Sequence, residues 1–484
     1  MTGILRSAVN SRNRYVRLAA ILFICLAAGA SVGAVLGFLG PLLTTVLLVA
    51  VVIGCLVLQS TQTGLYVLVA VICLLPFAAL PIDIGFTPTL LDIALGAVFL
   101  VWAMQIMTHR HGDFVGTPIG FMVLIFIVLA IASFIAGLAH SSLTANALRH
   151  FAEIILSVAV FFLVVNTVRT RRQLERLVRV ILLAGFCAAV IGVVLYVLPQ
   201  DLSVRILSTL RVVGYPSGPS ALRFVEDNPD NPLRAISTSV DPNILGGTLI
   251  LVGGLAVPQL FARDPVLPHR WTVLVTGTVG LCLFLTFSRG SMAGLGLALL
   301  VLSAVRYRRL GWALLAVALV ALILPQTQAY IQRALEGVRG EDLATQMRIG
   351  EYRDALTLIS RYPWFGVGFI GTPDIDTYLG VSMVYLLIAE KMGITGLLAF
   401  LAAAVMFFVH SWRAWRTTLR DGHMEPILLG FLTAILGALL GGTLDHYLFN
   451  PDFPHAAAFF WLYMGLGMVA GRLATAEEPA IGEG

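Results

Sequence analysis

The chain has 484 residues, and only 12% of them are charged, whereas 58% are apolar. A soluble globular domain carries roughly 25% charged residues. This composition excludes a soluble protein with several ordinary cores as well as a disordered chain, and it predicts a polytopic membrane protein. The net charge of +5 would indicate a nucleic-acid partner only if the basic residues shared one surface. The sequence distributes them among many short loops, so we expect the lipid bilayer and no nucleic acid as a partner.

Apolar stretches long enough, or nearly long enough, to cross a bilayer recur along the chain. The first could be mistaken for a signal peptide, but its apolar run is too long, so we expect a signal anchor. The expected stretches are 17–39, 41–58, 63–82, 88–107, 118–138, 148–168, 180–198, 242–262, 271–287, 290–305, 311–325, 393–412, 427–444 and 455–471. They predict an all-α fold, a transmembrane helical bundle of about 12–14 spans that forms a single transmembrane domain over 1–484.

Basic residues indicate the side of the membrane on which each loop lies, because short cytoplasmic loops carry an excess of Lys and Arg. With the N-terminus inside, most arginines fall in short cytoplasmic loops beside helix ends. Both termini are therefore expected in the cytoplasm, where 474–484 would form a disordered acidic tail. The stretch from Arg169 to Arg179 is expected to form a basic helix against lipid headgroups.

Two long segments fall on the opposite, external side: 199–241 and 326–376. Loops of this length in a tight bundle are usually functional. Their net charges are −1 and −2, so an anion there would have to be held by particular arginines. Lys391 is the only lysine of the chain. An anion site would accordingly use guanidinium groups, whose paired N–H donors suit a diphosphate.

Arg289 lies in the short turn Thr286-Phe287-Ser288-Arg289-Gly290 between two apolar stretches. These stretches are barely long enough to span, which draws the turn to the outer edge of the bilayer or slightly into it. An arginine in that position is costly unless it meets an anion or water. Arg289 is therefore a ligand for a lipid-linked phosphate, or it extends to the interface or pairs with an acidic loop residue.

Arg348 begins a helical pattern that runs from Thr345 to Ser360 and is ended by Tyr362-Pro363. One face of this predicted helix is otherwise apolar and should pack on the membrane domain; it holds Arg348, Tyr352, Ala355 and Ile359. Arg348 would then point inward, while Arg353 and Arg361 point elsewhere. The structural alternative is an ion pair of Arg348 with Glu351 or Glu341.

The segment after this helix contains two short motifs. Glycines at 366, 368 and 371 match G-x-G-x-x-G, but no strand precedes them, so a flexible external loop with an interfacial Trp364 is expected instead of a nucleotide fold. Asp374-Ile375-Asp376 is a D-x-D motif, which suggests a divalent metal, a helix N-cap or a general base. The base is the more plausible of the functional interpretations, because arginines could bind a diphosphate without a metal.

Two further polar groups border predicted spans on the external side. Asp241-Pro242-Asn243, which follows Arg234, opens one spanning helix. Asp445-His446-Tyr447 and His455 flank the last external turn. A histidine at this interface is either a base or a solvated or capping residue.

In their order and sidedness these motifs resemble the O-antigen ligase and O-antigen polymerase superfamily of bacterial envelope proteins. The resemblance covers about 60–470 and rests on Arg234 with Asp241-Pro242-Asn243, Ser288-Arg289-Gly290, Arg348-x-x-x-Tyr352-x-x-Ala355, Pro363-x-x-Gly366-x-Gly368, Tyr378-Leu379 and Glu390-x-x-Gly393. It implies a C-type integral-membrane glycosyltransferase in the bacterial inner membrane, without a metal or other cofactor. Such enzymes pass a glycan from undecaprenyl diphosphate to lipid A core or to another lipid-linked repeat.

The resemblance also implies roles for individual residues. Arg289 and Arg348 would hold the diphosphate and stabilise it as leaving group. Ligases carry a His just before the Tyr-Leu helix start, whereas this chain has Asp376 there. Either Asp376 is the base, or His446 or another residue is, or the acceptor differs from that of a ligase. The remaining expected substrate-binding residues are Arg234, Asn243, Tyr352, Arg361, Tyr378, Asp445 and His446. A transporter or flippase of lipid-linked sugars is the alternative function, and an envelope scaffold is a third.

Overall fold

The computed structural model describes residues 56–475, apart from 82–84, 109–112, 324–342, 374–379 and 419–420, together with parts of 10–54. The predicted all-α class is confirmed, because 74% of the described residues are helical and they form no strand. The chain divides into two compact units, Met1–Thr63 and Gly64–Gly484. In the first unit, 14–24 are helical. The predicted spans 17–39 and 41–58 fall largely outside the described residues, and so does the tail from 476 on.

Among the described residues, eight helices are long and apolar enough to cross a membrane. They are α4 (Leu90–Met107), α5 (Gly120–Gly137), α6 (Ala145–Thr167), α7 (Arg171–Val197), α9 (Pro242–Gln259), α15 (Val384–Thr417), α16 (Met424–Gly441) and α17 (Pro454–Thr475). Three apolar helices are shorter: α3 (Thr61–Leu74), α10 (His269–Leu285) and α11 (Arg289–Val305). Near them lie α8 (Gln200–Thr209), α12 (Arg308–Ile323) and α14 (Leu343–Arg361). The total number of spans stays a prediction.

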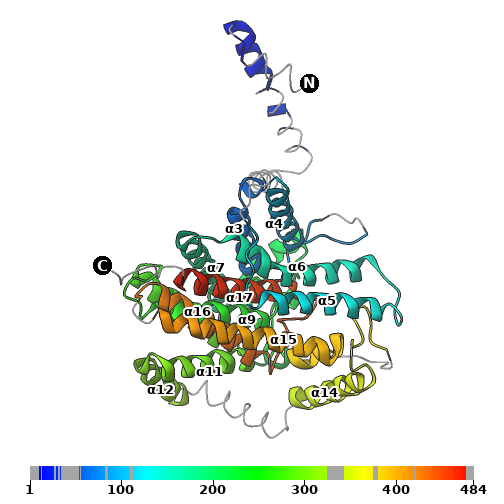
Figure 1. Cartoon of the computed structure of the whole chain (residues 1–484), viewed down its shortest axis with the longest axis vertical. Coiled ribbons are helices and arrows are strands. Elements are labelled where there is room, and N and C mark those ends of the chain that lie inside the picture. The colour runs from blue at the N-terminus through cyan, green and yellow to red at the C-terminus, as the bar shows by residue number, and fades with distance from the viewer. Residues whose placement is uncertain are drawn as a thin grey trace. The chain divides into compact units, whose positions relative to one another are not determined.

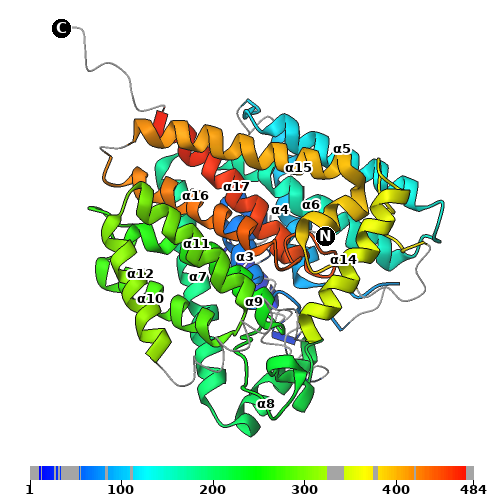
Figure 2. The same cartoon turned by 90° about the horizontal axis from the view of Figure 1, so that it is seen from below.

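Three helices form the core of the second unit: α17, α16 and α9, which are buried along almost their whole length. Helix α17 packs against α6, α15 and α16, while α16 also packs against α9 and α11 (Figures 1 and 2). Helices α5, α10 and α12 expose many large apolar side chains. A helix that is apolar all round and half covered by protein is suited to a lipid-facing position.

Small residues let the core helices approach one another closely. A Cβ atom added to Gly254 of α9 would lie 2.5 Å from the Cα atom of Ala434 in α16. A Cβ atom added to Gly294 of α11 would lie 2.6 Å from the carbonyl oxygen of Gly437, also in α16. Backbone contact of this kind is typical of helix pairs in membranes. It fixes α9 and α11 relative to α16.

One expectation about local structure is wrong. The basic stretch from Arg169 to Arg179 is no separate surface helix, because α7 runs unbroken from Arg171 to Val197. The reason is a capping box in which Thr170 and Gln173 start the helix, and no helix-breaking residue follows. The helix predicted from Thr345 to Ser360, by contrast, is confirmed as α14.

The predicted segment 199–241 is folded upon itself. It holds α8 and three short 3₁₀ helices, Leu210–Val213, Pro219–Ala221 and Val225–Asp227. Four of its apolar residues form a small hydrophobic core together with Leu195 of α7: Leu207, Ala221, Leu222 and Ile236. The segment is therefore compactly folded, and its last residue, Asp241, caps the start of α9. Of the second predicted segment, 326–376, the structure describes 343–373.

Ion pairs and arginine contacts gather at one end of the bundle, which we call the arginine-rich end. Arg472 donates to the carbonyl oxygens of Val165 and Val168 at the end of α6. Arg171 pairs with Asp421 at 2.8 Å, and Arg306 pairs with Glu425 at 2.6 Å. Helices α6 and α17 both end here, so their first residues lie at the opposite end, which we call the site end.

Candidate functional site

A cavity of about 670 Å³ opens at the site end. Its walls come from the first residues of α6 and α9, the segment between α14 and α15, α15 itself and the loop between α16 and α17. The polar residues among its lining are Thr144, Asn146, His150, Asp241, Asn243, Lys391, Asp445, His446, Asn450 and Asp452. Pocket walls built from several helix ends with convergent polar groups are typical of binding sites in bundles.

The start of α9 is set by Asp241, as the sequence predicts. The Asp241 side chain accepts hydrogen bonds from the backbone N–H groups of Asn243 (2.7 Å) and Ile244 (3.2 Å), and Pro242 occupies the first helical position. Both choices suit a helix N-terminus. Val240, just before the cap, has φ 61°, which is rare for a β-branched residue. The surrounding contacts hold this backbone and aim Asp241 and Asn243 at the cavity.

Arg234 connects this helix start to the turn that carries Arg289. Its Nη2 atom donates to Asn243 Oδ1 over 2.7 Å, and its Nε atom donates to the carbonyl oxygen of Thr286 over 2.8 Å. Arg234 therefore lies beside the cavity, in contact with one lining residue. Two directed bonds from one guanidinium hold the two helix starts in a fixed relation.

Arg289 is the first residue of α11, and Ser288 caps this helix through a hydrogen bond from the backbone N–H of Ser291. The side chain of Arg289 is half-buried. A Cβ atom added to the next residue, Gly290, would lie 3.1 Å from Leu444 Cβ. The turn of Arg289 thus packs on the chain segment that leads directly to Asp445.

Helix α14 places Arg348 and Tyr352 toward the same loop. On the predicted inward face Ala355 is fully buried and Arg348, Tyr352 and Ile359 are half-buried, while Arg353 is exposed. Glu351 receives hydrogen bonds from the backbone N–H and the hydroxyl of Ser382 (3.0 and 2.6 Å), which ties α14 to the start of α15. Burial raises the pKa of the Tyr352 hydroxyl; the charge of Arg348 opposes this rise, and that of Asp445 adds to it.

Asp445 is a buried carboxylate that lines the cavity at the site end. Burial raises its pKa, the Asp241 carboxylate adds to that rise, and the charges of His446 and Arg348 oppose it. Its Oδ1 atom accepts the backbone N–H of His446 over 2.8 Å and lies 3.5 Å from His446 Nδ1. Asp445 is thus influenced by charges from three elements: Arg348 of α14, Asp241 at the start of α9 and His446 of the α16–α17 loop.

Sequence reasoning missed Lys391 as a lining residue. Lys391 is 9% exposed and pairs with Glu390, with 3.2 Å between Nζ and Oε1. The backbone beside it is contacted closely: Val367 N–H donates to the Glu390 carbonyl over 2.9 Å, and Gly368 N–H donates to the Lys391 carbonyl over 3.0 Å. The sequence offered one indication that Lys391 is functional: it is the only lysine of the chain and lies in an apolar stretch, where a charged residue usually has a function.

The glycine motif after α14 is a packing device, and the expectation of a flexible loop is wrong. Gly366 and Gly368 have φ 66° and 83°, which glycine adopts without strain. A Cβ atom added to Gly366 would lie 2.3 Å from the Glu390 carbonyl oxygen. Gly366 lets this segment lie directly on the α15 backbone, and Gly368 lets it lie on α5, where an added Cβ atom would be 2.7 Å from the Gly137 Cα atom. Trp364 is exposed, as an interfacial residue would be.

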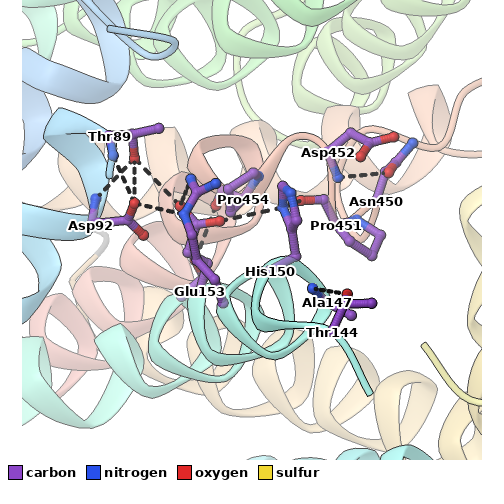
Figure 3. A network of polar contacts seen from close by, with 12 residues as sticks. Thr89, Asp92, Thr144, Ala147, His150, Glu153, Asn450, Pro451, Asp452 and Pro454 are labelled. Carbon is purple, nitrogen blue, oxygen red and sulfur yellow. Dashed lines mark hydrogen bonds and ion pairs between the residues drawn. The ribbon is translucent and has the colours of Figure 1, made fainter. Parts of the chain in front are cut away.

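Sequence reasoning also missed a polar network at the start of α6 (Figure 3). His150 Nδ1 lies 3.2 Å from the Pro451 carbonyl oxygen and 3.5 Å from Glu153 Oε2. Arg149 bonds Glu153 Oε1 at 3.1 Å and Asp92 Oδ2 at 2.9 Å. Asp92 and Thr89 form a capping box at the start of α4. The sequence indicated this network only through Glu153, an acidic residue inside the predicted span 148–168, where such residues are usually functional.

The structure brings together most of the predicted site residues. Asn243, Asp445 and His446 line the cavity, and Arg234, Arg348 and Tyr352 adjoin it through the contacts above. Arg361 does not join them, since it ends α14 in an exposed position, about 20 Å along the helix from Arg348. The predicted base Asp376 and Tyr378 lie outside the described residues. In the described part of the chain, no three His, Cys, Asp or Glu side chains are grouped so that they could hold a metal ion.

Residues 273–401 match the family model described as O-antigen ligase. No curated protein matches the chain. The matched range runs from α10 into α15 and includes Arg289, Arg348 and Lys391. The fold is that of a polytopic helical membrane protein, and the match places residues 273–401 with the O-antigen ligase family model. The chain carries an O-antigen ligase domain, which confirms the resemblance to that superfamily and indicates an enzyme like a glycosyltransferase.

Proposed function

We propose that this protein moves a glycan from undecaprenyl diphosphate to a hydroxyl group of an acceptor glycan or lipid at the outer leaflet of the bacterial inner membrane. The observation that carries the proposal is the position of Asp445. Its carboxylate is under the electrostatic influence of Arg348, its loop packs against the turn of Arg289, and it lines the cavity. Two arginines from different elements thus border one loop at the mouth of a site.

The chemistry of transfer explains why arginines would be needed. Breaking the bond between the sugar C1 atom and the diphosphate leaves negative charge on the phosphate oxygens. Guanidinium groups that meet those oxygens with paired N–H donors stabilise this charge as it develops. Arg289 and Arg348 are assigned to this role, and Arg234 is assigned to holding the turn of Arg289 in place.

The two ends of the bundle support an outer-leaflet site. The arginines of the α6–α7, α11–α12 and α15–α16 turns and Arg472 of α17 belong to the arginine-rich end, which is cytoplasmic by the positive-inside rule. The cavity opens at the other end. A lipid-linked donor would reach it from the outer leaflet.

The cavity favours an acceptor rich in hydroxyl groups. Three carboxylates line it, from Asp241, Asp445 and Asp452, whereas the charge of Lys391 is matched by Glu390. An anionic acceptor would be repelled, and a neutral or amino sugar would find many hydrogen-bond acceptors. Its volume of about 670 Å³ is in the range of small-molecule sites.

The experiment uses the purified protein in lipid vesicles with undecaprenyl-diphosphate-linked glycan from the source cells. It measures released undecaprenyl diphosphate and glycan length for the wild type, Arg289→Ala, Arg348→Ala and the matched control Arg353→Ala. Arg353 lies on the same helix as Arg348 but is exposed. Release that the first two substitutions abolish and the control retains would support the transferase. A ladder of lengths would identify a polymerase, and one transfer to an added acceptor would identify a ligase.

Movement of intact donor across the vesicle membrane without release would contradict the proposal in favour of a transporter or flippase. The same assay therefore measures how much donor becomes accessible on each side of the vesicle. Loss of function in all three variants would also contradict the assigned roles, because Arg353 touches no part of the proposed site.

A further inference from the structure

We infer that His150 is the general base of the proposed transfer and that Glu153 is its positioning residue; this rests on the proposed function. The inference starts from the location of His150. It lies in the second turn of α6, its side chain is 27% exposed, and it lines the cavity at the site end. A hydroxyl group of an acceptor in that cavity would be within its reach.

The contacts of His150 determine which ring nitrogen can take a proton. Nδ1 lies 3.2 Å from the carbonyl oxygen of Pro451. A carbonyl oxygen only accepts hydrogen bonds, so in the neutral ring Nδ1 carries the hydrogen. Nε2 is then the nitrogen with the free lone pair. A histidine whose Nδ1 is bound to a fixed acceptor is oriented for general-base catalysis through Nε2.

Glu153 helps to hold the ring of His150 in place. Its Oε2 atom lies 3.5 Å from His150 Nδ1, one helical turn farther along α6. Its other oxygen is held by Arg149 at 3.1 Å, and Arg149 is held in turn by Asp92 of α4 at 2.9 Å. The Glu153 oxygen beside Nδ1 restricts the orientation of the ring, with Nε2 free to take a proton.

His446 lines the same cavity and is the competing candidate. Within the described part of the chain, its buried Nδ1 atom has no hydrogen-bond partner. The Asp445 oxygen that lies 3.5 Å from it already accepts the His446 backbone N–H. No hydrogen bond therefore selects a tautomer of His446, whereas the hydrogen bond to the Pro451 carbonyl selects that of His150. The charge of Arg348 also acts on Asp445. We therefore assign Asp445 and His446 to the part of the site that binds the diphosphate of the donor.

The chemical step balances with groups already named. The acceptor oxygen forms a bond to C1 of the donor sugar, and its proton passes to Nε2 of His150. The bond between C1 and the diphosphate oxygen breaks, and its electron pair leaves with undecaprenyl diphosphate. The proton on His150 is lost to solvent after the product departs.

The test compares His150→Ala, His446→Ala and the control His410→Ala in the vesicle assay, with and without added imidazole. His410 lies on α15 toward the arginine-rich end, bound to its own helix through Met406. His150→Ala should lower kcat by about a hundredfold or more, leave binding of undecaprenyl diphosphate unchanged, and regain about tenfold in kcat when imidazole is added. A histidine that is merely structural would not respond to imidazole.

The role of Glu153 is tested by Glu153→Gln alone and together with His150→Ala. If Glu153 acts through His150, it lowers kcat in the wild type but adds no further loss to His150→Ala. Additive losses would overturn the positioning role. Normal kcat in His150→Ala, or rescue by imidazole of His446→Ala instead, would overturn the assignment of the base. Absence of release by the wild type would instead overturn the proposed function itself.

Discussion

Arg234 donates a hydrogen bond from Nη2 to Oδ1 of Asn243 over 2.7 Å while its Nε atom holds the carbonyl oxygen of Thr286. One side chain therefore joins the first turn of α9 to the turn that begins α11. Asn243 lines the cavity and Arg289 follows Thr286 by three residues. The position of Arg289 relative to the cavity thus depends on the guanidinium group of Arg234, which need not touch the substrate itself.

Replacing Arg234 by lysine should destabilise the fold, because one ammonium cannot form both directed bonds at once. We expect a loss of about 1–3 kcal/mol, read as a lower thermal midpoint in detergent. Arg211→Lys is the control, since Arg211 is exposed on a 3₁₀ helix of the same segment. Equal midpoints for the wild type and Arg234→Lys would contradict the bridging role.

Asp445→Asn should change stability in a pH-dependent way. Burial holds the folded-state pKa of Asp445 above its ordinary value of 3.8. Any stability linked to this group is therefore full below the unfolded-state pKa and is lost as pH rises through the folded-state pKa. Asparagine removes the buried charge, so the variant should have a higher thermal midpoint than the wild type near neutral pH. The difference should vanish in acid, and a wild type that is the more stable protein at neutral pH would refute this account.

The contact of α11 with α16 should tolerate no added methyl group at Gly294. An alanine Cβ there would lie 2.6 Å from the Gly437 carbonyl oxygen and 2.7 Å from the Gly441 nitrogen. Overpacking of this kind costs about 1–3 kcal/mol, and Gly294→Ala should unfold at lower temperature. Gly296→Ala, on the same helix, meets nothing within 4 Å and should match the wild type. Similar behaviour of the two variants would argue against the packing described.

Lysine at either proposed diphosphate ligand should rescue activity only in part. Alanine at Arg289 or Arg348 removes a donor to the developing charge, a loss of about 10²–10³ in kcat. Lysine keeps the charge but loses the paired N–H geometry, so its kcat should fall between alanine and arginine. Steady-state release of undecaprenyl diphosphate measures this. Full activity of the lysine variants would mean that charge alone suffices.

The fold could be predicted where hydropathy and helix caps acted together. The apolar stretches that fall within the described residues, the Asp241 cap of α9 and the helix α14 all depend on local sequence, and the structure bears them out. The surface helix expected at Arg169 to Arg179 failed because arginine has good helix propensity. Nothing in the basic stretch separates it from the apolar helix that follows.

The site could be predicted less completely, because a cavity is made by contacts between distant segments. Asn243, Asp445 and His446 were found from their places beside predicted spans. His150 was overlooked because nothing in the sequence shows that α6 begins next to Pro451, 301 residues away. The glycine motif was interpreted as a loop because its partner, the α15 backbone, is also nonlocal.

The most direct test of the account is an electron cryomicroscopy map of the protein in a lipid nanodisc with undecaprenyl diphosphate added. The account predicts diphosphate density between the side chains of Arg289 and Arg348, next to Asp445 and the cavity. The lipid chain should run outward along the bundle at the site end. Diphosphate density at the arginine-rich end, beside Arg171, Arg306 or Arg472, would contradict the account.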